Sequence, residues 1–147
     1  MIEKSNAPKS FITQMSREEK ITFIKTMVAL ARVDKDFDDD EKYFIKDTAI
    51  VFGLKLSDVD EILAPATNDE ILSMASKITN REVALQLIKE LCFLANSNGD
   101  LSDEEIVFIG NLGKAMNIEL KKIEEISQWV LDRLLWIERG KIIFEQV

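Results

Sequence analysis

Hydrophobic positions recur along most of the chain with the spacing of an α-helix. One run extends from Ile21 to Ala31 and a second from Leu85 to Ala95, and both place apolar residues three and four positions apart. Each run ends in five consecutive apolar residues. Because one helix face cannot hold five residues in a row, we expect these two helices to be buried on several sides. The pattern predicts that they pack against each other at the centre of the fold.

The two runs belong to a longer internal repeat. Residues 16–63 align with residues 80–127 at a constant offset of 64, without a gap, and fourteen of the forty-eight aligned positions are identical. Two copies are too few for a solenoid, so the repeat predicts a pseudo-two-fold arrangement inside one globular fold. The residues expected near the two-fold axis are Met27, Leu30, Leu91 and Leu94.

Local signals give the expected helix boundaries. Ser16, Asp38, Thr79 and Ser102 are each followed three residues later by Glu, which is the form of a capping box. Gly53 and Asn117 are equivalent positions where a helix should end in left-handed geometry. The pattern predicts an all-α, compact multi-helical bundle without β-strands. Its expected helices lie near 8–14, 17–33, 39–52, 57–63, 68–77, 80–97, 103–116 and 119–138.

The length predicts a single main domain. At 147 residues the chain can bury one sizeable core. We expect residues 1–15 to form an N-terminal arm with a short helix, and 16–147 to form one domain from the repeats 16–63 and 80–127 and a closing C-terminal helix. That last segment is unusually apolar and holds both tryptophans, Trp129 and Trp136. It is expected either to close the core or to form a partner or dimer surface.

Composition narrows the classes of function. A net charge of −8 disfavours nucleic acid as a partner, because phosphate binding needs clustered Lys and Arg. The chain has no histidine, which excludes Ser-His-Asp and Cys-His catalysis and His-ligated zinc. Cys92 lies in an apolar run and is expected in the core. We find no secretory signal and no stretch long enough to span a membrane, so we expect a cytoplasmic, non-enzymatic protein.

Two acidic segments, 34–41 and 98–105, join each central helix to the next. Their oxygen-bearing side chains are candidate ligands for Ca²⁺ or Mg²⁺. An EF-hand loop does not fit, because a register ending at Glu105 places Leu94 at the first ligand position. Helix capping alone explains the same residues, so capping with or without a weak cation site remains open. The candidate ligands are Asp34, Asp36, Asp38, Glu41, Asn98, Asp100 and Glu105.

The two segments also carry the pattern Ala-x-x-Asp-Gly-x-hydrophobic-Ser-x-x-Glu, at 31–41 and 95–105. This pattern, occurring twice in an all-α chain, resembles the tellurite-resistance TerB-like family over about residues 15 to 140. The resemblance implies a helical domain with a central antiparallel helix pair, a metal-binding or membrane-proximal scaffolding role, and no established enzymatic activity. The family's acidic positions correspond to Asp34, Glu41 and Glu105. Asn98 replaces the fourth, and Lys35 replaces the usual Gly.

Together these observations favour a non-enzymatic interaction or stress-response module. Weak binding of Ca²⁺ or Mg²⁺ at the two acidic segments is an additional expectation. A protein partner is expected, with a membrane-associated complex as one setting, while nucleic acid and a membrane span are not. The alternatives are a cation-regulated helix–loop–helix sensor resembling an EF-hand and a metal-dependent hydrolase. The identity of the partner and the oligomeric state are left open.

Overall fold

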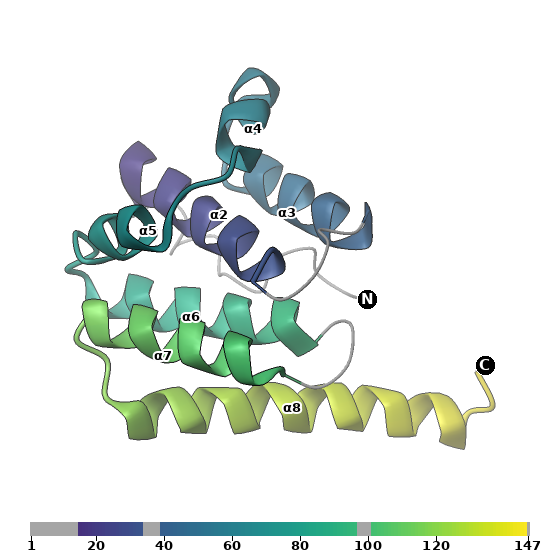
Figure 1. Cartoon of the computed structure of the whole chain (residues 1–147). Coiled ribbons are helices and arrows are strands. Elements are labelled where there is room, and N and C mark those ends of the chain that lie inside the picture. Colours follow the sequence, from purple (N-terminus) through teal and green to yellow (C-terminus); the bar gives the residue numbers. More distant parts are fainter. Residues whose placement is uncertain (1–14, 34–38, 97–100, 147) are drawn as a thin grey trace.

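The computed structural model describes residues 15–33, 39–96 and 101–146, and all the regular secondary structure in these ranges is α-helical. The all-α prediction is therefore confirmed, whereas the short helix expected at 8–14 lies outside the described residues. The helices, traced in Figure 1, are α2 (Arg17–Ala31), α3 (Asp39–Val51), α4 (Leu56–Leu63), α5 (Asn68–Ala75), α6 (Arg81–Asn96), α7 (Asp103–Ala115) and α8 (Leu120–Ile143).

Helices α2 and α6 pack against each other and form the centre of the molecule. Helices α3, α4 and α5 pack on α2, whereas α7 and α8 pack on α6 (Figure 1). The side chains expected at the centre are all buried: Met27, Leu30, Leu91 and Leu94. Each of the two apolar runs is therefore covered by several neighbouring helices, as the five consecutive apolar residues predicted.

Capping boxes begin three of the helices. At α2 the Ser16 hydroxyl accepts a hydrogen bond from the Glu19 amide at 3.1 Å, and the Glu19 carboxylate accepts one from the Ser16 amide at 2.9 Å. The same reciprocal pair forms between Ser102 and Glu105 at α7. A third box, Thr67 with Glu70, begins α5 and was not predicted. These bonds satisfy amides that have no acceptor within the helix.

The expected cap at Thr79 is wrong. The side-chain oxygen of Asn80 accepts hydrogen bonds from the amides of Glu82 at 2.9 Å and Val83 at 3.3 Å. Asparagine is as good a helix cap as serine and better than threonine, so the neighbouring residue performs this role. Helix α6 consequently begins at Arg81.

Corresponding helices begin at the same offset of 64. Helices α3 and α7 occupy equivalent ranges, and α4 and α8 begin at equivalent residues. Gly53 and Asn117 both have positive φ, at 81° and 60°. After each, an amide returns to a carbonyl five residues earlier, Leu54 to Ala49 at 3.0 Å and Ile118 to Gly113 at 2.8 Å. The rotation that relates the two copies stays a prediction.

The C-terminal helix departs from the expected closing role. Helix α8 has 24 residues, ending at Ile143 rather than near 138, and only Ile123 and Val130 are fully buried. In Figure 1 its second half extends past the ends of α6 and α7. Trp129 is 54% exposed and Trp136 is 76% exposed. The first half of α8 therefore covers the core, whereas both tryptophans are largely exposed, and a partner or dimer surface at this segment stays a prediction.

Candidate functional site

The predicted cation ligands fall into two groups. Asp34, Asp36, Asp38, Asn98 and Asp100 lie outside the described residues. Glu41 and Glu105 are described, and both are buried in the third position of α3 and of α7. No cluster of three metal-ligating side chains occurs within 15–33, 39–96 and 101–146. The cation sites therefore stay a prediction.

Glu105 has a clear role in helix capping. Its Oε1 atom accepts the Ser102 backbone amide at 2.9 Å, and its own amide donates to the Ser102 hydroxyl at 3.1 Å. This carboxylate oxygen is therefore already occupied by a backbone donor. Capping accounts for the burial of Glu105 without a metal ion.

A groove lies between α2, α5 and the beginning of α7, and we call it the α2–α5–α7 groove. Its volume is about 620 Å³, and residues 64–66 belong to its lining. The floor is apolar, because Val28, Ile71 and Phe108 present buried side chains to it. Its size falls within the range usual for ligand pockets, about 300–1,000 Å³.

The two rims of this groove carry opposite charges. Lys25 and Arg32 project from α2, whereas Asp103 and Glu104 belong to the first turn of α7. The acidic pair stands at the positive end of the α7 dipole, where negative charge stabilises the helix. A bound molecule would therefore meet cations on one side of an apolar floor and anions on the other.

Arg32 is held in place by the end of α4. Its Nη2 atom donates a hydrogen bond to the Leu63 carbonyl oxygen at 3.1 Å. Leu63 is the last residue of α4, where carbonyl groups lack amide donors within the helix. This contact links the end of α2 to the end of α4 and holds the Arg32 guanidinium beside the groove.

No pattern in the amino-acid sequence predicted this groove. The residues at 64–66 are Ala64-Pro65-Ala66, and Ala29 in the first copy corresponds to Phe93 in the second. Small residues in one copy where the other has a large one were the available signal. The structure shows that all four of these small residues line the groove.

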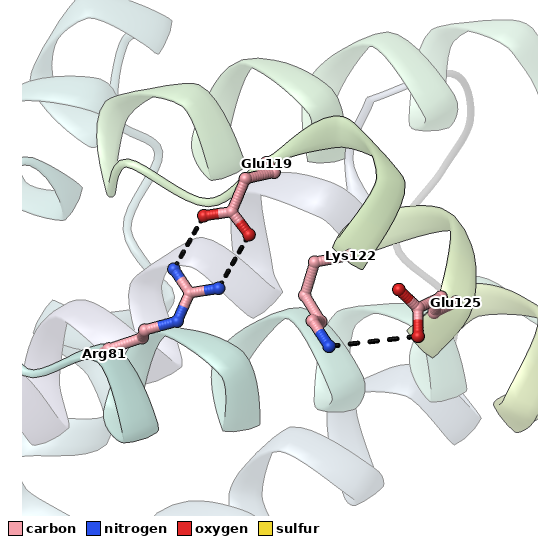
Figure 2. Close-up of polar contacts among 4 residues, drawn as sticks. All are labelled: Arg81, Glu119, Lys122 and Glu125. Atoms are coloured by element: carbon pink, nitrogen blue, oxygen red, sulfur yellow. Dashed lines mark hydrogen bonds and ion pairs between the residues drawn. The ribbon is translucent and has the colours of Figure 1, made fainter.

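An ion pair joins the start of α8 to the start of α6. The Arg81 guanidinium donates two hydrogen bonds to the Glu119 carboxylate, at 2.9 and 2.7 Å, as Figure 2 shows. This bidentate contact lowers the pKa of Glu119 and raises that of Arg81. One turn further, Lys122 and Glu125 form a longer ion pair at 3.8 Å (Figure 2).

Cys92 is part of the core, as expected from its apolar neighbours. It is 1% exposed. Burial raises the pKa of its thiol to about 11, and a hydrogen bond with the Ser127 side chain acts in the opposite direction. Because the thiolate is the reactive form, this residue is a poor nucleophile.

Comparison with protein families gives a match to part of the chain. The family model described as tellurite resistance protein TerB matches residues 6–64. Neither the curated proteins nor the solved structures include a significant match to the chain. Within the described ranges, no helix has the length and apolar character needed to cross a membrane.

Proposed function

Because the chain is TerB-like over residues 6–64, we propose that it is a non-enzymatic interaction module of a tellurite-resistance or other stress-response system. The proposed partner is an amphipathic helix of a cytoplasmic protein, bound in the α2–α5–α7 groove. The observation that carries this proposal is the apolar floor between rims of opposite charge. All of α2, which lines the groove, lies inside the matched region.

The shape and chemistry of the groove suit a helix better than a small polar substrate. Helix-in-groove recognition uses apolar side chains three and four residues apart that enter a hydrophobic trough. Two helices, α2 and α7, supply the long walls here, and the floor between them includes Val28 and Phe108. An apolar trough without a nucleophile–base pair on its lining also favours binding over catalysis.

The charged rims specify the partner further. Acidic residues along one edge of the bound helix would face Lys25 and Arg32, and basic residues along the other edge would face Asp103 and Glu104. Reversing the helix would bring like charges together, so the rims select one orientation. We therefore expect the partner helix to have an apolar face flanked by acids on one edge and bases on the other.

Designed peptides provide the test. One amphipathic helical peptide carries acidic and basic edges in the matched arrangement, a second has the two edges exchanged, and a third has its apolar face replaced by Ser. Each is titrated into the ¹⁵N-labelled full chain by NMR. We expect the matched peptide to shift signals of groove residues and to bind at least about tenfold more tightly than the exchanged peptide, a difference of about 1.4 kcal/mol.

A filling variant separates the groove from the rest of the surface. Ala29→Phe places in the groove the residue that the second copy carries at the equivalent position, and it should abolish binding of the matched peptide. Ser73→Phe adds the same ring to α5 at an exposed position that does not line the groove, and it should leave binding unchanged. Equal binding by wild type and Ala29→Phe, or no preference among the three peptides, would refute the proposal.

A further inference from the structure

The outward face of α8 changes character along its length. Between Lys121 and Gln128 its exposed positions are polar: Lys121, Glu124, Glu125 and Gln128. Beyond that point large apolar side chains are exposed beside the charged ones: Trp129, Leu135, Trp136, Ile142 and Ile143, which we call the α8 stripe. Leu135 is 57% exposed and Ile142 is 77% exposed. The first half is an ordinary solvated helix surface, and the second half is not.

The spacing within the α8 stripe is that of a helix interface. Trp129, Trp136 and Ile143 follow one another at intervals of seven residues, and so do Leu135 and Ile142. Seven residues make about two turns, so these side chains line one side of the helix. Val130 and Ile123, which face the core, are also seven apart and occupy the other side. The stripe is thus a second apolar face, directed away from the protein's own core.

The charge of the C-terminal residues limits which molecules can bind to the α8 stripe. Residues 129–147 contain three acidic and three basic side chains, whereas the rest of the chain carries the whole net charge of −8. The α8 stripe is therefore a part of the surface where another acidic molecule, including a second copy, meets little repulsion. In Figure 1 this half of α8 extends beyond α6 and α7.

Asp132 and Arg139 give the orientation. Both are exposed, and both lie between the apolar pairs of the stripe. In an antiparallel pair centred between Leu135 and Trp136, Asp132 of each copy faces Arg139 of the other. A parallel pair would instead place each charge against its like. The Gln128 amide donates to Asp132 Oδ1 at 2.8 Å and so restrains the carboxylate on this face.

From these observations we propose that the chain forms an antiparallel homodimer through the α8 stripe. In this dimer Leu135 packs on Trp136 of the second copy, and Trp129 packs on Ile142 of the second copy. Two Asp132–Arg139 ion pairs flank the central contact. The two acidic bodies lie on opposite sides of the paired helices, which keeps their charges apart.

Sedimentation measurements on the full chain test the dimer directly. The overlapping helices, about 24 Å long, make an interface at the small end of the usual range. We therefore expect a reversible dimer that grows between about 10 and about 500 µM chain. Trp136→Ser should shift the dissociation constant at least about tenfold. Tyr43→Ser, which removes a 70% exposed aromatic side chain from α3, should not. A monomer at every concentration, or a dimer insensitive to Trp136→Ser, overturns the proposal.

Charge exchange tests the pairing between Asp132 and Arg139. Asp132→Arg alone and Arg139→Asp alone should each weaken the homodimer, because like charges then meet across the interface. Mixing these two variants should restore a dimer, since each chain then supplies the missing sign. Both residues are exposed, so neither change should unfold the protein. If the mixture of the two variants does not associate, the proposed Asp132–Arg139 contact is refuted.

Cross-linking tests the orientation. Gln128 of one copy should face Ile143 of the other, so Gln128→Cys and Ile143→Cys chains should join when mixed with a short bis-maleimide. Each variant alone should react far less. The native Cys92 is buried and does not compete. Strong linking of Gln128→Cys to itself would indicate a parallel pair, and binding of a monomer to phosphatidylglycerol vesicles would assign the stripe to a lipid surface. Either result refutes the antiparallel dimer.

Discussion

The two copies of the repeat begin alike and finish differently. Helices α3 and α7 occupy equivalent residues, and α4 and α8 start at equivalent residues, but α4 has 8 residues and α8 has 24. In the first copy Pro65 follows the end of α4, and the groove beside Ala29 stays open. In the second copy α8 continues, and its Arg133 guanidinium lies 5.5 Å from the centre of the Phe93 ring.

This difference shows how one helix stop changes the surface of a repeated unit. Proline cannot donate to the helix ladder, and its ring crowds the preceding turn, so α4 cannot extend along α2 as α8 extends along α6. The space that a longer helix would cover becomes the α2–α5–α7 groove. The extra turns of the second copy create instead a helix with a free apolar side.

Equivalent core leucines give the strongest test of the comparison. Leu30→Ala and Leu94→Ala remove the same side chain at equivalent buried positions, and each should reduce the free energy of unfolding by about 2–5 kcal/mol. Leu120→Ala, at a 65% exposed position, is the control and should change it by less than about 0.5 kcal/mol. Urea denaturation measures all three. If only one of the two core substitutions reduced the free energy of unfolding by less than about 1 kcal/mol, the core would depend mainly on the other copy.

Introducing the stop of the first copy into the second tests the role of helix length. Trp129 occupies the position equivalent to Pro65, so Trp129→Pro should interrupt α8 and destabilise the protein by about 3 kcal/mol. Trp129→Ala removes the same half-exposed side chain but keeps the helix, and it should cost much less. Thermal unfolding monitored by circular dichroism compares the two. If both variants melt at the same temperature, the turns beyond Trp129 do not contribute to the stability of the second copy.

The acidic segments give the smallest expected effect. We expect Ca²⁺ or Mg²⁺ to bind weakly, with dissociation constants of about 10⁻⁴ to 10⁻³ M, as in incomplete and hydrated sites. The segment 34–41 should bind better than 98–105, where Asn98 and Ser102 replace carboxylates. In calorimetric titrations, Asp34→Asn combined with Asp36→Asn should remove more heat than Asp100→Asn. No heat and no thermal shift at about 10 mM cation would leave capping as the whole explanation.

Several helix limits were predictable because they depend on nearby residues alone. Ser16 and Ser102 supply caps within their own first turns, and Gly53 and Asn117 adopt the positive φ that ends a helix. The Asn80 cap was missed because two adjacent residues, Thr79 and Asn80, can both cap a helix. Which of the two residues caps the helix depends on a small difference in free energy, and the pattern of residue types does not resolve it.

The candidate site could not be predicted in the same way. The groove requires α2, α5 and α7 to meet, and these elements are separated by tens of residues in the chain. Lys25, Arg32, Asp103 and Glu104 carry no shared motif, so nothing local relates the two rims. The candidate cation ligands could be named from the sequence because they lie close together along the chain. For Glu105, closeness to Ser102 allows a helix-capping hydrogen bond.

The amino-acid sequence by itself determined the all-α class, the burial of the two central apolar runs and the register between the two copies. These properties follow from helical periodicity and from caps that act within one turn. Only the tertiary structure decided which apolar residues are covered. Periodicity assigns Val130 and Trp136 equally to apolar faces, yet Val130 is buried while Trp136 is 76% exposed. Burial depends on whether another element occupies the facing space, and that is a property of the assembled helices.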